Sequence, residues 1–203
     1  QNKLPIYYSK GFPESKLAHK YLDGLKGVEI GGSYHNAWGL DIINVDRADP
    51  PEGNGSREVC GEDLPVHVIA NGDELPFEDK FFDFVISSHV LEHIFDPIKA
   101  LKEWQRVARR YIFIIVPHRD RCGDKQRSVT TVTELIGRHR GTLKESDEGD
   151  SSIDAHHNVW TTKSFLNLCK TFEFNVIDYL DVDDKVGNGF AIVIETGQTS
   201  DNT

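Results

Sequence analysis

The stretch ANGDELPFEDKFFDFVISSHVLEH, residues 70–93, carries more information about the fold than any other part of this 203-residue chain. Residues 81–86 form a largely apolar run, which is typical of a buried strand. A polar turn at residues 87–89 follows, and Asp96-Pro97 is typical of a helix start. Open α/β sheets bind their ligands where such strands end. The stretch therefore predicts a strand whose carboxyl end faces a binding site.

Two upstream stretches support this interpretation. VEIGGSYHN, residues 28–36, indicates a strand followed by a glycine turn, and paired glycines let a backbone pass close to a ligand. IINVDRAD, residues 42–49, indicates a second strand that ends at Asp46, about 15 residues after the glycines. This is roughly the spacing at which a carboxylate meets a ribose. Together the two stretches predict a nucleoside-binding βαβ unit.

The order of these motifs resembles that of the class I S-adenosylmethionine-dependent methyltransferases, most closely those that act on small molecules. The motifs are Glu29-Ile30-Gly31-Gly32, Asp46, Gly72-Asp73-Glu74-Leu75-Pro76-Phe77, Phe82-Asp83-Phe84-Val85 and Leu91-Glu92-His93. The resemblance covers residues 26–117 and continues more loosely to the C-terminus. The form EIGGSxHNxxGL is similar to a variant among enzymes of glycan and cell-surface biosynthesis.

The expected fold is α/β, with a Rossmann-like, seven-stranded, mostly parallel sheet, a C-terminal antiparallel hairpin and helices on both faces. The turn-rich stretch DVDDKVGNG, residues 181–189, favours the hairpin. We treat residues 1–203 as a single methyltransferase domain with a tail at 197–203. Strands are expected at 26–31, 41–46, 66–70, 82–87, 111–116, 172–180 and 189–195, and helices at 13–25 and 96–109.

The segment from His118 to Trp160 differs from the rest of the chain because it is polar and has little strand character. Long irregular stretches in a compact domain are usually functional or disordered. This one follows the fifth expected strand at the carboxyl edge of the sheet. We therefore expect residues 118–160 to form a substrate-binding lid.

The resemblance implies S-adenosylmethionine as the cofactor and assigns a role to each matching residue. The turn formed by Glu29, Gly31, Gly32 and Ser33 lies beneath the amino acid portion of the cofactor. Tyr34-His35-Asn36 stands where the family has a third glycine, which changes the contacts of this turn.

The remaining contacts that the resemblance implies are to the ribose, the adenine and the sulfonium of the cofactor. Asp46 accepts hydrogen bonds from the ribose hydroxyls, Asp73 accepts one from the adenine amino group, and Glu74 and Leu75 frame the ring. Ser88 and His89 lie near the sulfonium.

Methyl transfer to a hydroxyl requires removal of its proton, and histidine is the natural base near neutral pH. The candidate catalytic residues are His118, His156 and His157. Asp120 and Asp154 are conceivable metal ligands together with these histidines, but no spacing such as HxxxH supports a metal site, and none is expected.

Composition excludes several other classes of function. The 23 basic and 33 acidic residues give a net charge of -10, which opposes binding to a nucleic acid backbone. No apolar run approaches the ~20 residues of a membrane helix, and no apolar signal-peptide core is present, so we expect a cytoplasmic protein without a membrane partner. The widely spaced cysteines, Cys60, Cys122 and Cys169, are expected to be free thiols.

The sequence thus predicts an S-adenosylmethionine-dependent methyltransferase that methylates an oxygen of a small molecule, such as a sugar or glycan precursor; a nitrogen acceptor remains open. One alternative is a cofactor-binding partner protein without catalysis. A second is a nicotinamide-dependent oxidoreductase, but GGSYHN does not match GxGxxG and no second phosphate cradle is found.

Overall fold

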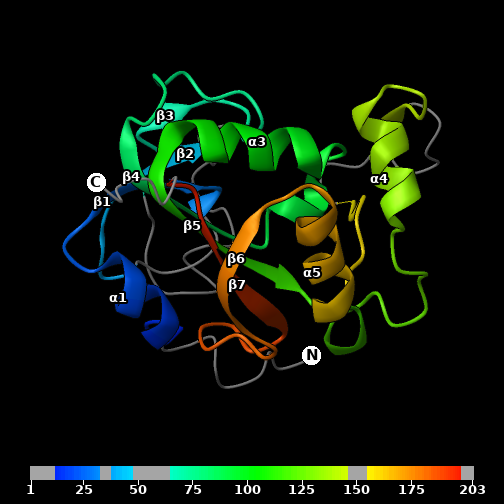
Figure 1. The fold of residues 1–203 in the computed structure, drawn as a ribbon. Coiled ribbons are helices and arrows are strands. Elements are labelled where there is room, and N and C mark those ends of the chain that lie inside the picture. The colour runs from blue at the N-terminus through cyan, green and yellow to red at the C-terminus, as the bar shows by residue number, and fades with distance from the viewer. Residues whose placement is uncertain (1–11, 33–37, 48–64, 146–154, 198–203) are drawn as a thin grey trace, which may run out of the picture.

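The core is a seven-stranded sheet with the order β3-β2-β1-β4-β5-β7-β6 (Figure 1). This computed structural model describes residues 12–32, 38–47, 65–145 and 155–197. The strands are β1 Lys26–Ile30, β2 Asp41–Asp46, β3 Val68–Ile69, β4 Phe82–Ser88, β5 Ala108–Pro117, β6 Asn175–Leu180 and β7 Gly189–Glu195. Strands β1 to β5 pair in parallel, and β7 runs antiparallel to both of its neighbours. The expected fold class is confirmed.

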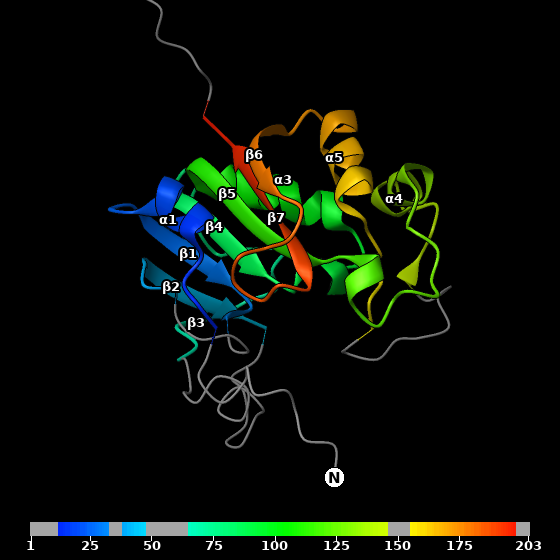
Figure 2. The ribbon, with the colours of Figure 1, turned by 90° about the horizontal axis from the view of Figure 1, so that it is seen from below.

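Helices cover both faces of the sheet (Figures 1 and 2). On one face, α1 (Lys16–Leu22) packs against Phe84 and Phe113. On the other face, α3 (Pro97–Val107) and α5 (Thr162–Thr171) pack against Val85 and Ile112. A further helix, α4 (Val132–His139), and two short 3-10 turns, η3 (Leu91–His93) and η4 (Arg119–Arg121), complete the described elements.

Local capping explains where these helices begin. Asp96 accepts hydrogen bonds from the N–H groups of Ile98 and Lys99, and Pro97 occupies the first turn of α3, as the sequence predicted. Capping boxes start two more helices. Thr131 pairs with Glu134 at α4, and Thr161 pairs with Ser164 at α5.

The structure differs from the expected elements in several places. The strand expected at 111–116 already begins at Ala108, because α3, expected to reach 109, ends at Val107. The helix expected at 13–25 starts only after Ser15, whose side chain caps it. The strand expected at 172–180 starts at Asn175, because the preceding residues close α5. The segment 118–160, expected to be irregular, contains α4.

Some expectations lie outside the described residues. These are the contacts of Ser33, the thiol of Cys60 and, apart from Gly197, the tail. Cys122 and Cys169 are free thiols, as expected. None of the helices within the described ranges is long and apolar enough to cross a membrane.

The topology gathers the candidate residues at one edge of the sheet. Strand order reverses between β1 and β4, and in open α/β sheets the crevice at such a reversal binds the ligand. Glycines 31 and 32 follow β1, Asp46 ends β2, and His89 follows β4. The β6–β7 loop, residues 181–188, reaches the same edge through a contact to His89.

Candidate active site

Hydrogen bonds to residues of β2 hold the glycine turn after β1. The N–H of Gly31 donates to the carbonyl of Val45 at 2.8 Å, and that of Gly32 donates to Oδ1 of Asn44 at 2.9 Å. Gly31 has a φ of +71°, a conformation that other residues rarely adopt. A Cβ on Gly32 would lie 2.5 Å from the carboxylate of Glu29. Positions 31 and 32 therefore require glycine, and without side chains their backbone is open to close approach at the carboxyl end of β1.

Glu29 underlies this turn as a buried carboxylate. Its Oε1 accepts a 2.7 Å hydrogen bond from Nε1 of Trp38. Burial raises the pKa of Glu29 to about 7, although the Trp38 hydrogen bond and the charge of Lys185 act against this shift. Lys185 comes from the β6–β7 loop, and its Nζ lies 4.3 Å from the centre of the Trp38 ring. The turn therefore rests on a carboxylate poised between its two protonation states near neutral pH.

Asp46 and Asp73 occupy different surroundings. Asp46 is half-buried at the end of β2, where its Oδ1 accepts the N–H of Arg47 at 2.7 Å. Asp73 forms a 3.0 Å ion pair with Lys99 of α3. Glu74 is exposed, while Leu75 is buried and donates its N–H to Glu103. The carboxylate of Asp73 is thus engaged by α3, and its predicted contact with adenine stays a prediction.

Ser88 and His89 lie together at the end of β4. His89 has a φ of +56°. Its Nδ1 lies 3.1 Å from Oγ of Ser88, and its Nε2 lies 2.8 Å from Oδ1 of Asn188. Burial lowers the pKa of His89, so the ring is neutral at physiological pH. A neutral ring suits a place beside a cationic sulfonium.

The loop that carries Asn188 is rigidly built. The buried carboxylate of Asp183 accepts backbone N–H groups from Lys185, Val186, Gly187 and Gly189. This loop therefore places both Asn188 and Lys185 without help from a ligand.

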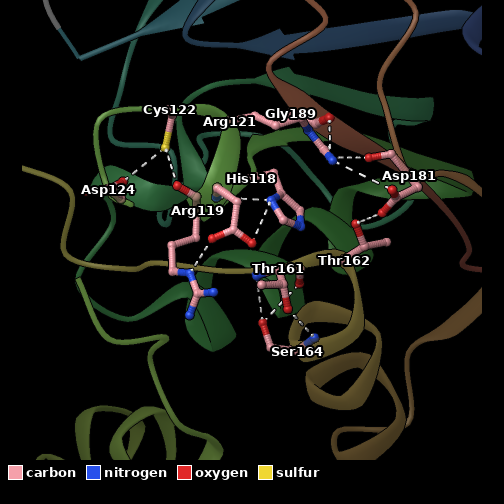
Figure 3. Close-up of polar contacts among 11 residues, drawn as sticks. His118, Arg119, Arg121, Cys122, Asp124, Thr161, Thr162, Ser164, Asp181 and Gly189 are labelled. Carbon is pink, nitrogen blue, oxygen red and sulfur yellow. Dashed lines mark hydrogen bonds and ion pairs between the residues drawn. The ribbon is translucent and has the colours of Figure 1, made fainter. Parts of the chain in front are cut away.

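The three histidines proposed as bases engage different partners. Nδ1 of His118 accepts the N–H of Asp120 at 3.2 Å and so caps η4 (Figure 3). Burial and the nearby Arg121 lower the pKa of His118. Because a backbone N–H can only donate, the ring nitrogen that would take up a proton is already occupied.

His156 is held in a different way. Its Nδ1 lies 2.6 Å from Oδ2 of Asp124, an arrangement that fixes the proton on Nδ1 and turns the Nε2 lone pair outward. Burial raises the pKa of Asp124, but hydrogen bonds from His156 and Arg127 outweigh this and lower it overall, so the carboxylate is ionised. His157 is buried and lies 3.3 Å from Glu145.

A hollow of about 670 Å³ opens beside His156 and His157. Every described residue that lines it belongs to the segment 118–160. Its polar wall is formed by Arg127, Ser128, Thr130, Glu134, Arg138, His156 and His157. Such a wall suits a ligand rich in hydroxyl groups.

Next to this hollow, Glu92, His93 and His156 each bring one metal-ligating atom into a group whose atoms all lie within 4.8 Å of one another. Glu92 is 1% exposed, and burial raises its pKa to about 8. Of the metal ligands considered from the sequence, His156 belongs to this group, but Asp120 and Asp154 are not among its members. Asp120 pairs with Arg119, and Asp154 lies outside the described residues.

Sequence reasoning did not assign a role to several of these residues. Asn44 had a visible signal, since it is a polar residue inside an apolar strand. Glu92 and His93 belong to the Leu-Glu-His motif, which supported the resemblance to the family but gave neither residue a chemical role. Asp124 and Asn188 act through partners 32 and 99 residues away, which no local pattern indicates.

Comparison with known proteins agrees with this geometry. The model of the family described as "Methyltransferase domain" matches residues 30–115, the part of the chain that runs from the end of β1 to β5. Residues 30–115 are therefore similar to methyltransferase domains. The class, S-adenosylmethionine-dependent methyltransferase, and its cofactor agree with the sequence prediction; the resemblance to enzymes of glycan biosynthesis is not shown by these comparisons.

Relatives match this domain over part of their length. An uncharacterised protein of Methanocaldococcus jannaschii is 31% identical over 134 residues, which cover 59% of this chain and 61% of that protein. An uncharacterised methyltransferase of Mycolicibacterium vanbaalenii is 34% identical over 92 residues, 42% of this chain and 36% of the relative. The chain thus spans between about a third and three fifths of the length of these two relatives.

A solved structure has the same fold. The S-adenosylmethionine-dependent methyltransferase of Thermotoga maritima, described as a possible histamine N-methyltransferase, superposes with a TM-score of 0.50 at 21% identity, covering 86% of this chain and 84% of that one. At this identity the likeness shows the fold alone.

Proposed function

We propose that this protein transfers a methyl group from S-adenosylmethionine to a hydroxyl oxygen of a small polyhydroxylated molecule, such as a sugar or glycan precursor. The observation that carries the proposal is the Asp124–His156 pair on the wall of the hollow. It places an oriented imidazole beside a space lined by polar groups.

The cofactor fits the residues at the carboxyl edge of the sheet. The backbone at Gly31 and Gly32 leaves the close approach that the amino acid end requires. Asp46 offers a carboxylate to the ribose, and the neutral His89 adjoins the position of the sulfonium. When bound, S-adenosylmethionine supplies an electrophilic methyl group on a positively charged sulfur.

The chain itself has to orient the acceptor and take one proton. The acceptor oxygen forms a bond to the methyl carbon as the carbon–sulfur bond breaks, in line with one another. The hydroxyl proton passes to Nε2 of His156, and Asp124 stabilises the imidazolium that results. The segment 118–160 acts as the lid that holds the acceptor, since all the described residues that line the hollow belong to it.

The proposal is tested by a methylation assay with mass-spectrometric detection. The panel contains free sugars, nucleotide sugars and matched amines. We expect the mass of one methyl group on a hydroxyl-containing member, and a rate of product formation lower by about 10²- to 10⁴-fold with His156→Ala. Binding of S-adenosylhomocysteine without turnover on any member would instead favour a non-catalytic partner protein, and products on amines alone would refute oxygen as the acceptor atom.

A further inference from the structure

The cluster next to the hollow contains a buried carboxylate oxygen with no donor. Oε2 of Glu92 is shielded from solvent and has no hydrogen-bond partner among the described residues. A buried polar atom normally has a partner, and leaving one unsatisfied costs about 1–3 kcal/mol. This oxygen therefore points to a missing positively charged or hydrogen-donating group.

Two imidazoles stand beside this oxygen. Nε2 of His93 lies 3.7 Å from Oε1 of Glu92. The rings of His93 and His156 meet edge to face, with their centres 4.8 Å apart. The side chains of both histidines are 28% exposed, so a small ion can reach them from solvent.

A hydrogen bond at Nδ1 orients each of the two imidazoles. Nδ1 of His93 lies 3.1 Å from the carbonyl oxygen of Ala155, and Nδ1 of His156 lies 2.6 Å from Oδ2 of Asp124. Carbonyl and carboxylate oxygens only accept, so each Nδ1 carries the proton. Each ring therefore has its lone pair on Nε2. Metal-ligating histidines almost always show this pattern, in which the ring nitrogen that does not bind the metal donates a hydrogen bond to an oxygen.

We propose that Glu92, His93 and His156 bind a divalent first-row transition-metal ion. Two imidazole nitrogens and one carboxylate are a ligand set found for Zn²⁺ and Fe²⁺, and they leave positions open for other ligands. Ligand atoms in a tetrahedral zinc shell lie about 3.4 Å apart. The three side chains have to close from separations of up to 4.8 Å, a change that small side-chain rotations achieve.

The site rests on this geometry alone, whereas its role toward the acceptor rests on the proposed function. An ion held by these residues would offer an open position beside the hollow to an acceptor hydroxyl and would lower the pKa of that hydroxyl, as metals do for bound water. His156 would then be a ligand and not the base, and the bound hydroxyl would release its proton to solvent water. The two roles of His156 differ in one measurable respect, because a base works without metal.

The test is a titration of chelator-stripped protein with Co²⁺ and Zn²⁺, followed by visible absorption and calorimetry. We expect one ion per wild-type chain. Glu92→Gln and His156→Ala should weaken binding by about 100-fold or more, and Asp124→Asn should weaken it by about 10- to 100-fold.

His139→Ala is the matched control. His139 also pairs with an aspartate, Asp96, at 2.9 Å and is also 28% exposed, but it lies outside the cluster. Absence of binding to the wild type, or equal binding by Glu92→Gln and His156→Ala, would overturn the metal site.

Metal binding without methyl transfer would support the site and refute the proposed function. Methyl transfer by metal-free protein that binds no ion would refute the site and return His156 to the role of base.

Discussion

The carboxylate of Glu29 lies directly against Gly32, so that a Cβ on this glycine would stand 2.5 Å from it and 2.8 Å from Oδ1 of Asn44. Glu29 and Asn44 are both buried. Glu29 accepts the indole N–H of Trp38, and Asn44 accepts the N–H of Gly32 itself, so both side chains are fixed beside the turn. The glycine turn and its support therefore form one tightly packed unit.

Gly32→Ala should disrupt this unit. Overpacking of this kind costs about 1–3 kcal/mol, and displacement of the turn should weaken S-adenosylhomocysteine binding by about 10-fold or more. Urea denaturation and calorimetry measure the two effects. Gly197→Ala is the control, because a Cβ there would meet only the carbonyl oxygen of Arg109 at 3.4 Å. Unchanged affinity in Gly32→Ala would show that the turn does not face the cofactor.

Glu29→Gln should change how stability depends on pH. The folded-state pKa of Glu29 is raised from 4.5 to about 7, so its contribution to stability is fully present below pH 4.5 and is lost as pH rises through 7. The wild type should therefore lose up to roughly 3 kcal/mol relative to Glu29→Gln over this interval. Denaturation of both proteins between pH 4.5 and 8 measures the difference. Glu92 is present in both proteins, so its contribution to the pH dependence cancels in the comparison. Parallel curves of stability against pH would contradict the raised pKa of Glu29.

Asp46→Ala should remove a contact to the cofactor. A carboxylate that accepts ribose hydroxyls contributes about 1.5–3 kcal/mol, so affinity for S-adenosylhomocysteine should fall roughly 10- to 100-fold. Asp41→Ala is the matched control, because Asp41 begins the same strand that Asp46 ends and is exposed at the opposite edge. Calorimetry with NAD as a second ligand also tests the nicotinamide alternative. Equal loss in both variants would refute a ribose contact at Asp46.

Local signals were sufficient for the fold. Asp96-Pro97 predicted the start of α3 because capping and the proline ring act within one turn. Apolar runs predicted the strands, since parallel strands are buried on both faces. The capping box that begins at Thr131 was also readable, but the polar composition of residues 118–160 hid α4.

Long-range pairs limited prediction of the site. His118, His156 and His157 were equivalent in the sequence. The fold brings Asp124 to His156 over 32 residues, whereas the N–H of Asp120 that occupies His118 belongs to the local cap of η4. The orientation of His93 likewise depends on a contact with Ala155, 62 residues further along the chain.

His118→Ala and His156→Ala should separate these histidines in the methylation assay. Nδ1 of His118 is occupied by the N–H of Asp120, so its loss should change kcat by less than about 3-fold once the acceptor is known. His156 lines the hollow and is oriented by Asp124, and loss of a group that activates the acceptor costs about 10²- to 10⁴-fold. Both variants should keep their affinity for S-adenosylhomocysteine, which separates catalysis from cofactor binding. A large fall in kcat for His118→Ala, with His156→Ala unaffected, would move the catalytic centre to the end of β5.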